Sequence, residues 1–145
     1  MAVLPKVVLN TDLNEGFCFG CGRKNPIGLK LSFTREGDTL RAEFTPGTVH
    51  QGWPGIVHGG ILAALLDEAM SNAVYGEGVT CLTASLQTRL RQPAKVNEPL
   101  LITARVTRNR KRLVETEARL CLKDGTVVAE STAKQFVVDN EGGPS

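Results

Sequence analysis

The chain has 145 residues, a length typical of one domain that can bury a substantial apolar core. Hydrophobic residues make up 41% and charged residues 22%, and the formal net charge is +2, so the totals indicate neither a nucleic-acid nor a membrane partner. No apolar run is long enough to cross a bilayer, and Pro5 and Lys6 interrupt any signal-peptide core. We therefore expect a cytoplasmic protein whose four cysteines are thiols or ligands rather than disulfides.

A single domain is expected over residues 1–145, with a core at about 17–138 between loose ends. The core begins near 18-CFGCG-22, where Cys-x-x-Cys has the spacing of half a zinc site. A four-ligand site needs two more ligands, which His50 or the cysteines of a symmetry partner could supply. The alternative is a glycine-rich turn with packed thiols. No obligatory metal or cofactor is implied, and the other two cysteines, in strand-like segments, are interpreted as core or sheet residues.

The first predicted elements form a hairpin. Apolar residues alternate over 29–33, a turn follows at 36–38, and the alternation resumes over 40–44. A helix is then predicted over about 58–75, with apolar side chains nearly all round and a break before Gly76 and Gly78.

Four strands are predicted after the helix, at 81–91, 99–108, 112–122 and 126–138. In the first, strict alternation places Thr83, Ser85 and Arg89 on one face and leucines on the other. The predicted order is β-β-α-β-β-β-β, an α+β fold with an antiparallel sheet wrapped around one central helix.

One feature of the helix is chemically unusual. Asp67 lies among Leu65, Leu66, Ala69 and Met70, and an unpaired buried carboxylate costs several kcal/mol. A neighbouring hydroxyl such as that of Ser71 could satisfy it without any chemistry. Glu68 falls about 100° away around the helix. We expect it to be solvated or paired with an arginine, and keep it as the reserve candidate.

The motif His58-Gly59-Gly60, followed by Asp67, resembles the His-Gly-Gly…Asp signature of the PaaI-like acyl-CoA thioesterases, which have the hotdog fold. The lead-in CFGCG…NPIGL is also similar to the start of many members, and the resemblance covers roughly 17–138. It implies an enzyme that hydrolyses an acyl-CoA thioester, with water as the second substrate.

Hydrolysis of a thioester needs donors for the developing oxyanion and a nucleophile, either a carboxylate or a water that it activates. Backbone N–H groups at a helix N-terminus can supply the donors, and Gly60 is the candidate. Asp67 lies about 10 Å further along the axis, too far to act on the same carbonyl. Two antiparallel helices of a homodimer can combine one Gly60 with the other Asp67, so we expect a homodimer or a dimer of dimers.

The resemblance implies further roles. His58 positions the thioester or the loop, and a hydroxyl of the following strand, Thr83 first and Ser85 next, assists Asp67. Gly59 lies beside the substrate. Relatives often carry Asn where this chain has Gly52, so the water-holding role stays open, with Gln51 a weak candidate. Residues 79–114 hold eight Lys or Arg and one acid, which suits the phosphates of coenzyme A. The candidates for phosphate contacts are Arg89, Arg91, Arg108, Arg110, Lys111 and Arg112.

Two other functions compete with hydrolysis. A sensor would bind acyl-CoA without turnover, although such a protein normally carries a DNA-binding element. A hotdog dehydratase would pair His50 with an acid fourteen residues later, where this chain has Ala64. The sequence leaves open the acyl group, coenzyme A against acyl-carrier protein, and direct attack against activated water.

Overall fold

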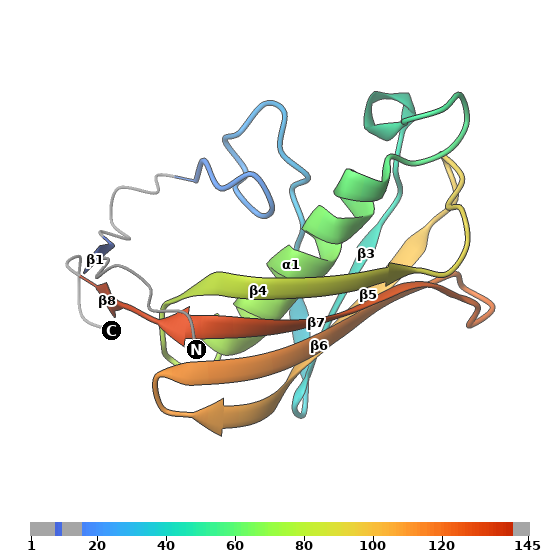
Figure 1. The fold of residues 1–145 in the computed structure, drawn as a ribbon. Coiled ribbons are helices and arrows are strands. Elements are labelled where there is room, and N and C mark those ends of the chain that lie inside the picture. Colours follow the sequence, from blue (N-terminus) through green and yellow to red (C-terminus); the bar gives the residue numbers. More distant parts are fainter. Residues whose placement is uncertain (1–7, 10–15, 141–145) are drawn as a thin grey trace.

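Six antiparallel strands form one sheet that curls around a single helix in the computed structural model, which describes residues 8–9 and 16–140 (Figure 1). The predicted order β-β-α-β-β-β-β and the hotdog architecture are confirmed. The elements of this core are β2 (Thr34–Glu36), β3 (Thr39–Phe44), α1 (Gly59–Tyr75), β4 (Cys81–Leu90), β5 (Leu100–Arg110), β6 (Leu113–Cys121) and β7 (Val127–Val137).

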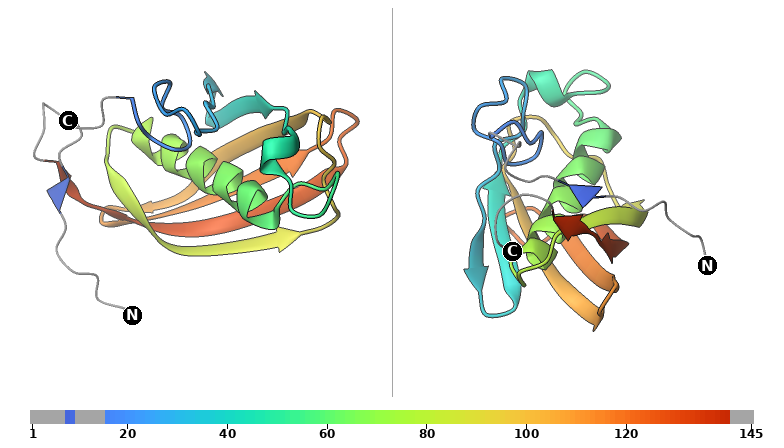
Figure 2. Two further views of the ribbon diagram at one scale, coloured as in Figure 1. Left: turned by 90° about the horizontal axis from the view of Figure 1, so that it is seen from above. Right: turned by 90° about the vertical axis from the view of Figure 1, so that its left-hand side faces the viewer.

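The strands lie in the order β2-β3-β5-β6-β7-β4, so the first strand after the helix forms one edge of the sheet. Figure 2 shows α1 lying along the concave face, with β2 and β3 at one side and β4 at the other. Burial of the helix explains its composition, since Leu65, Leu66, Ala69, Met70 and Val74 are all fully buried. No helix among the described residues is long and apolar enough to cross a membrane.

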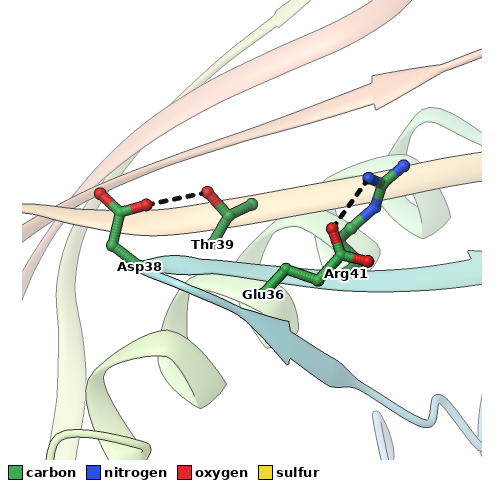
Figure 3. A network of polar contacts seen from close by, with 4 residues as sticks. All are labelled: Glu36, Asp38, Thr39 and Arg41. Carbon is green, nitrogen blue, oxygen red and sulfur yellow. Dashed lines mark hydrogen bonds and ion pairs between the residues drawn. The ribbon is translucent and has the colours of Figure 1, made fainter.

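The N-terminal hairpin is shorter than predicted. Residues 29–33 are not strand, although Leu29 and Leu31 are buried, and β2 begins only at Thr34. The two-residue turn places Gly37 at a φ of 62°, a conformation that glycine adopts without steric cost. Figure 3 shows the polar contacts beside this turn. Thr39 Oγ1 donates to Asp38 Oδ1 over 3.2 Å, and Arg41 pairs with Glu36.

The strict alternation predicted for 81–91 is wrong at one residue. The pairing of β4 with β7 shifts between Thr83 and Ser85, because Ala84 is an extra residue that forms a β-bulge. Thr83 therefore pairs with the buried Gln135 and faces the helix, whereas Ser85 pairs with Lys134 and faces outward. The bulge separates two hydroxyls that the sequence pattern placed on the same face.

A buried polar chain joins the sheet to the helix. Gln135 on β7 is fully buried, accepts a hydrogen bond from Thr116 Oγ1 on β6, and donates one from Nε2 to Ser71 Oγ on α1, both over 3.1 Å. Ser71 is therefore used by the core and is not the partner of Asp67. Because both ends of the Gln135 amide are hydrogen-bonded, this series of hydrogen bonds fixes the position of α1 against the sheet.

The terminal segments are described only in part. A short parallel pair joins β1 (Val8–Leu9) to β8 (Asp139–Asn140), which the sequence did not predict. The remaining terminal residues expected to be loose lie outside the described residues.

The first prediction concerns Gln135. Replacement by alanine removes both hydrogen bonds and leaves a cavity, so Gln135→Ala should lower the free energy of unfolding by about 2–4 kcal/mol in denaturant titrations. Thr132→Ala is the matched control, because Thr132 is exposed on the outward face of the same strand and its loss should change stability by less than about 0.5 kcal/mol. Equal losses in the free energy of unfolding for the two substitutions would show that the buried hydrogen bonds of Gln135 do not stabilise the position of the helix.

Candidate active site

Asp67 meets its partner across the gap between α1 and β4. Thr83 Oγ1 donates a hydrogen bond to Asp67 Oδ1 over 2.7 Å, a short distance typical of a hydroxyl bonded to a charged carboxylate. The bulge at Ala84 produces this contact, since it turns Thr83 toward the helix. Asp67 is only partly buried, so its second oxygen can face a substrate or a water molecule.

Cys81 lies on the same side of β4 as Thr83, two residues earlier and before the bulge. Burial and the negative charge of Asp67 raise the pKa of the Cys81 thiol from 9.0 to about 11. The Cys81 thiol is therefore neutral near pH 7 and adds no negative charge beside Asp67. Cys81 was interpreted from the sequence as a core or sheet residue, and its even spacing from Thr83 was a signal that the two share a face.

His58 is the N-cap of α1. Its Nδ1 accepts a hydrogen bond from the Gly60 N–H over 2.9 Å, and its carbonyl accepts from Ile61. Nδ1 is thus unprotonated in this arrangement, and a neutral ring carries its proton on Nε2. The donor predicted to hold the oxyanion is paired with the side chain two residues before it. The amide of Gly59, the first in the helix, has no intrahelical acceptor because of its position.

The loop before the helix is held by its own hydrogen bonds. Gln51 Oε1 accepts from the Gly55 N–H over 3.0 Å, which ties Gln51 to the loop. Gly52 lies against His58, and a β-carbon added there would come into van der Waals contact with it. His50 packs edge-on to the ring of Phe44 and its Nδ1 accepts from the Gly47 N–H. His50 therefore lies outside any cluster with Cys18 and Cys21, which corrects its candidacy as a metal ligand.

The basic residues do not converge on Asp67. Arg91 pairs with Glu130, while Arg108 and Arg110 lie 3.9 Å and 4.0 Å from Glu115. All of these pairs are partly exposed, which limits their contribution to stability.

The other candidate substrate-binding residues lie in two separate regions of the structure. Arg89 and Ser85 lie on the outward face of the sheet, and Arg89 lines a hollow of about 520 Å³ there, on the side opposite to the helix. Lys111 and Arg112 form the β5–β6 turn. Asn109 beside this turn donates to Glu77 just after α1, so the turn lies at the C-terminal end of the helix.

Glu68 has a different environment from the one predicted. Its carboxylate lies against the thiol of Cys18, with Sγ 3.5 Å from Oε1, and it accepts a hydrogen bond from Asn72 Nδ2 over 2.9 Å. Burial and Glu68 raise the pKa of the Cys21 thiol to about 12. The expectation that Glu68 is solvated or paired with an arginine is wrong, because the 18–21 loop covers this face of the helix.

Residues 54–129, which include α1 and most of the sheet, match the family model described as the thioesterase superfamily. The chain belongs to the thioesterase superfamily. The bovine acyl-coenzyme A thioesterase THEM4 is 25% identical over 141 residues, a match covering 94% of this chain and 58% of the bovine protein, so the chain spans little more than half of that relative.

Solved structures agree with the family assignment. A crystal structure described as a thioesterase superfamily protein is 27% identical, with a TM-score of 0.78, and the match covers 94% of this chain and 72% of that one. The Escherichia coli PaaI protein from the phenylacetic acid degradation operon is 18% identical, with a TM-score of 0.70 over 74% of this chain and 83% of that one. The second likeness supports the fold alone.

A second prediction follows from Cys81. Asp67→Asn removes one of the two causes of its raised pKa, so the pKa should fall but stay above 9.0 because burial is the larger cause. Iodoacetamide alkylation mapped by mass spectrometry should therefore be faster at Cys81 in Asp67→Asn than in the wild type between pH 9 and 11. Cys121, whose pKa is raised by burial and not by Asp67, is the internal control. Equal alkylation rates of Cys81 in the two proteins would show that the Asp67 carboxylate does not raise the pKa of the Cys81 thiol.

Proposed function

We propose that this chain hydrolyses an acyl-CoA thioester to the free acid and coenzyme A, with Asp67 as general base or nucleophile. The observation that carries the proposal is the 2.7 Å hydrogen bond from Thr83 to Asp67, on a helix that begins with His58-Gly59-Gly60. A carboxylate in an apolar helix that keeps one free oxygen is a suitable base for an attacking water. The similarity to THEM4, named an acyl-coenzyme A thioesterase, supports the choice of substrate class.

The cap of α1 sets a condition on catalysis. The Gly60 N–H can donate to the oxyanion only if the His58 imidazole releases it, since one N–H serves one strong acceptor. In this mechanism the thioester oxygen replaces Nδ1 as the acceptor, and the imidazole turns toward the substrate. His58 then acts as a positioning residue whose Nε2–H is available as a donor.

The active site is proposed to be shared by two subunits. Gly60 and Asp67 are separated by about 10 Å along one helix, too far for both to act on one carbonyl. The ten-residue β4 is an edge strand, and long unpaired edges favour pairing with another chain. Leu86 and Leu90, 40% and 54% exposed, face the helix side of this edge. An antiparallel pairing of β4 with its symmetry mate would cover both leucines and bring Gly60 of one helix toward Asp67 of the other.

The same arrangement gives the basic turn a role. Lys111 and Arg112 lie at the C-terminal end of α1, where the N-terminus of an antiparallel partner helix would be located. We infer that this turn contacts the phosphates of coenzyme A bound at the partner's Gly60. Arg89, on the outward face, is a weaker candidate because the sheet separates it from Asp67.

The third prediction tests the chemistry. Asp67→Asn should reduce kcat for release of free thiol from acyl-CoA substrates by about 10²–10⁴-fold, the usual contribution of a general base. Thr83→Val should cost about 10–100-fold by removing the hydrogen bond to the carboxylate, whereas Thr83→Ser, which keeps the hydroxyl, should retain most of the activity. Unchanged turnover in Asp67→Asn would exclude this mechanism. Tight acyl-CoA binding by the wild type without thiol release would instead favour the sensor.

The fourth prediction tests the shared site with a heterodimer. Gly60→Pro removes the donor at a position in the first helical turn where proline is tolerated, and Asp67→Asn removes the base. Both homodimers should be inactive. A heterodimer purified with two affinity tags has one site with both groups intact if the sites are shared, and should show about half of the wild-type activity.

A heterodimer of wild type with Asp67→Asn is the matched control and should also show about half of the wild-type activity. If each subunit built its site alone, the heterodimer of the two variants would be as inactive as its parents. Full activity of the Gly60→Pro homodimer would remove Gly60 from the oxyanion site.

A further inference from the structure

We propose that Cys18, Cys21 and Glu68 form a zinc site that fastens the N-terminal loop to the central helix. The site would be separate from the proposed active site and does not depend on thioesterase activity. Asp67 is directed to Thr83 on β4, whereas the adjacent Glu68 is directed to the loop at residues 18–21 on another face of α1. The loop lies beside α1 on the side of β2 and β3, opposite to β4 (Figure 2).

The distances between the candidate ligand atoms are compatible with a tetrahedral ion. One ligand atom from each residue, the two sulfurs and a carboxylate oxygen, lies within 4.8 Å of the others. Zinc bonds of about 2.3 Å to sulfur and 2.0–2.2 Å to oxygen give an S···O edge of about 3.5–3.7 Å in a tetrahedron. Cys18 Sγ lies 3.5 Å and 3.8 Å from the two Glu68 oxygens. An ion could therefore be bound with little movement of the side chains.

The charge of Glu68 has no cation to balance it among the described residues. None of the ion pairs found there includes Glu68, and its contacts are with the two thiols and with the amide of Asn72. Thiols are weak hydrogen-bond donors and stabilise a half-buried carboxylate poorly. A divalent cation would balance Glu68 and stabilise both sulfurs as thiolates, with release of two protons to solvent.

The loop backbone is built around the carboxylate. A β-carbon at Gly20, between the two cysteines, would overlap the Glu68 side chain, so a larger residue there would displace the carboxylate from the cysteines. The chain turns through a hydrogen bond from the Gly22 N–H to the Cys18 carbonyl over 2.9 Å, and the Leu31 N–H donates to the Gly20 carbonyl over 2.9 Å. Both cysteines are thus placed over Glu68 by backbone contacts as well as by their own side chains.

The donor set selects the metal. Two thiolates and one carboxylate suit zinc, whereas magnesium and calcium prefer ligand sets made only of oxygen. Three protein ligands leave a fourth position for water, and all three residues are half-buried, so an ion can enter from solvent. Asn72 would act behind the ligands, since its Nδ2 donates to Glu68 Oε1 and orients the carboxylate.

The experiment measures zinc directly. The full chain, reduced under nitrogen, stripped with a chelator and then dialysed against ZnCl₂, should retain one zinc per chain by mass spectrometric elemental analysis. Cys18→Ser, Cys21→Ser and their double variant should retain less than a tenth of that amount. Glu68→Gln should bind more weakly, and Asn72→Ala should lose about 10–100-fold in affinity as a residue behind the ligands.

Two further measurements keep the test independent of folding and of activity. CoCl₂ should give thiolate-to-cobalt charge-transfer absorption with the wild type and not with the double variant. Zinc should raise the Tm of the wild type and not that of the double variant, because it stabilises only a folded chain that carries the site. Cys121→Ser is the matched control, since this strand cysteine should leave zinc content and Tm shift unchanged. Circular dichroism verifies that the variants fold.

Three outcomes would overturn the proposal. They are the absence of zinc uptake by the reduced wild type, retention of zinc by the double variant, and a disulfide between Cys18 and Cys21 that persists in the presence of reductant. Loss of acyl-CoA hydrolysis with zinc content intact would bear on the proposed function alone.

Discussion

The helix α1 is apolar around most of its circumference, and it can be stable only if other structure covers it on every side. The curled sheet covers one side and the segment at 16–31 covers another, with Leu29 and Leu31 buried in the same core as Leu65 and Leu66. Because seven residues of the helix are buried, a polar group that lies among them needs a partner within the fold. The polar contacts between α1 and the rest of the fold are therefore made by the few polar side chains that the helix carries.

Three polar side chains of α1 have hydrogen-bond partners in three different parts of the fold. Ser71 bonds Gln135 of β7, Asp67 bonds Thr83 of β4, and Glu68 meets Asn72 and the thiols of the 18–21 loop. These contacts hold the helix to a central strand, to an edge strand and to the covering loop. The first involves the fully buried Gln135, whose amide is satisfied at both ends, whereas the other two leave a carboxylate oxygen or a charge in need of a further partner. We infer that the first serves stability and the other two serve binding.

Much of the fold could be predicted from the sequence because the signals were local. The apolar run at 59–75 and the strands that follow it differ clearly in period, and the turn at Gly37 is marked by its residue. The pairing of Thr83 with Asp67 was predicted from their spacing in relatives, but the strand pattern argued for the wrong face. A bulge depends on how two strands pair, and the residues around Ala84 carry no sequence signal for one. The environment of Glu68 was missed for a similar reason, since Cys18 lies 50 residues earlier in the chain, in a segment without periodicity.

The bulge also determines how the chain tolerates change. Ala84 is exposed, so its side chain should be free to vary, and a mutational scan of single substitutions would mark the position as unimportant. Deletion of Ala84 would remove the bulge and leave Thr83 opposite Gln135 on the helix side, because Ser85–Lys134 and Thr83–Gln135 would then be consecutive pairs of a regular ladder. A change of register that drew Ala84 into the ladder would instead turn Thr83 outward, away from Asp67, although no residue had been replaced. The pairing of β4 with β7, more than the identity of residue 84, therefore determines the side of the sheet on which Thr83 lies.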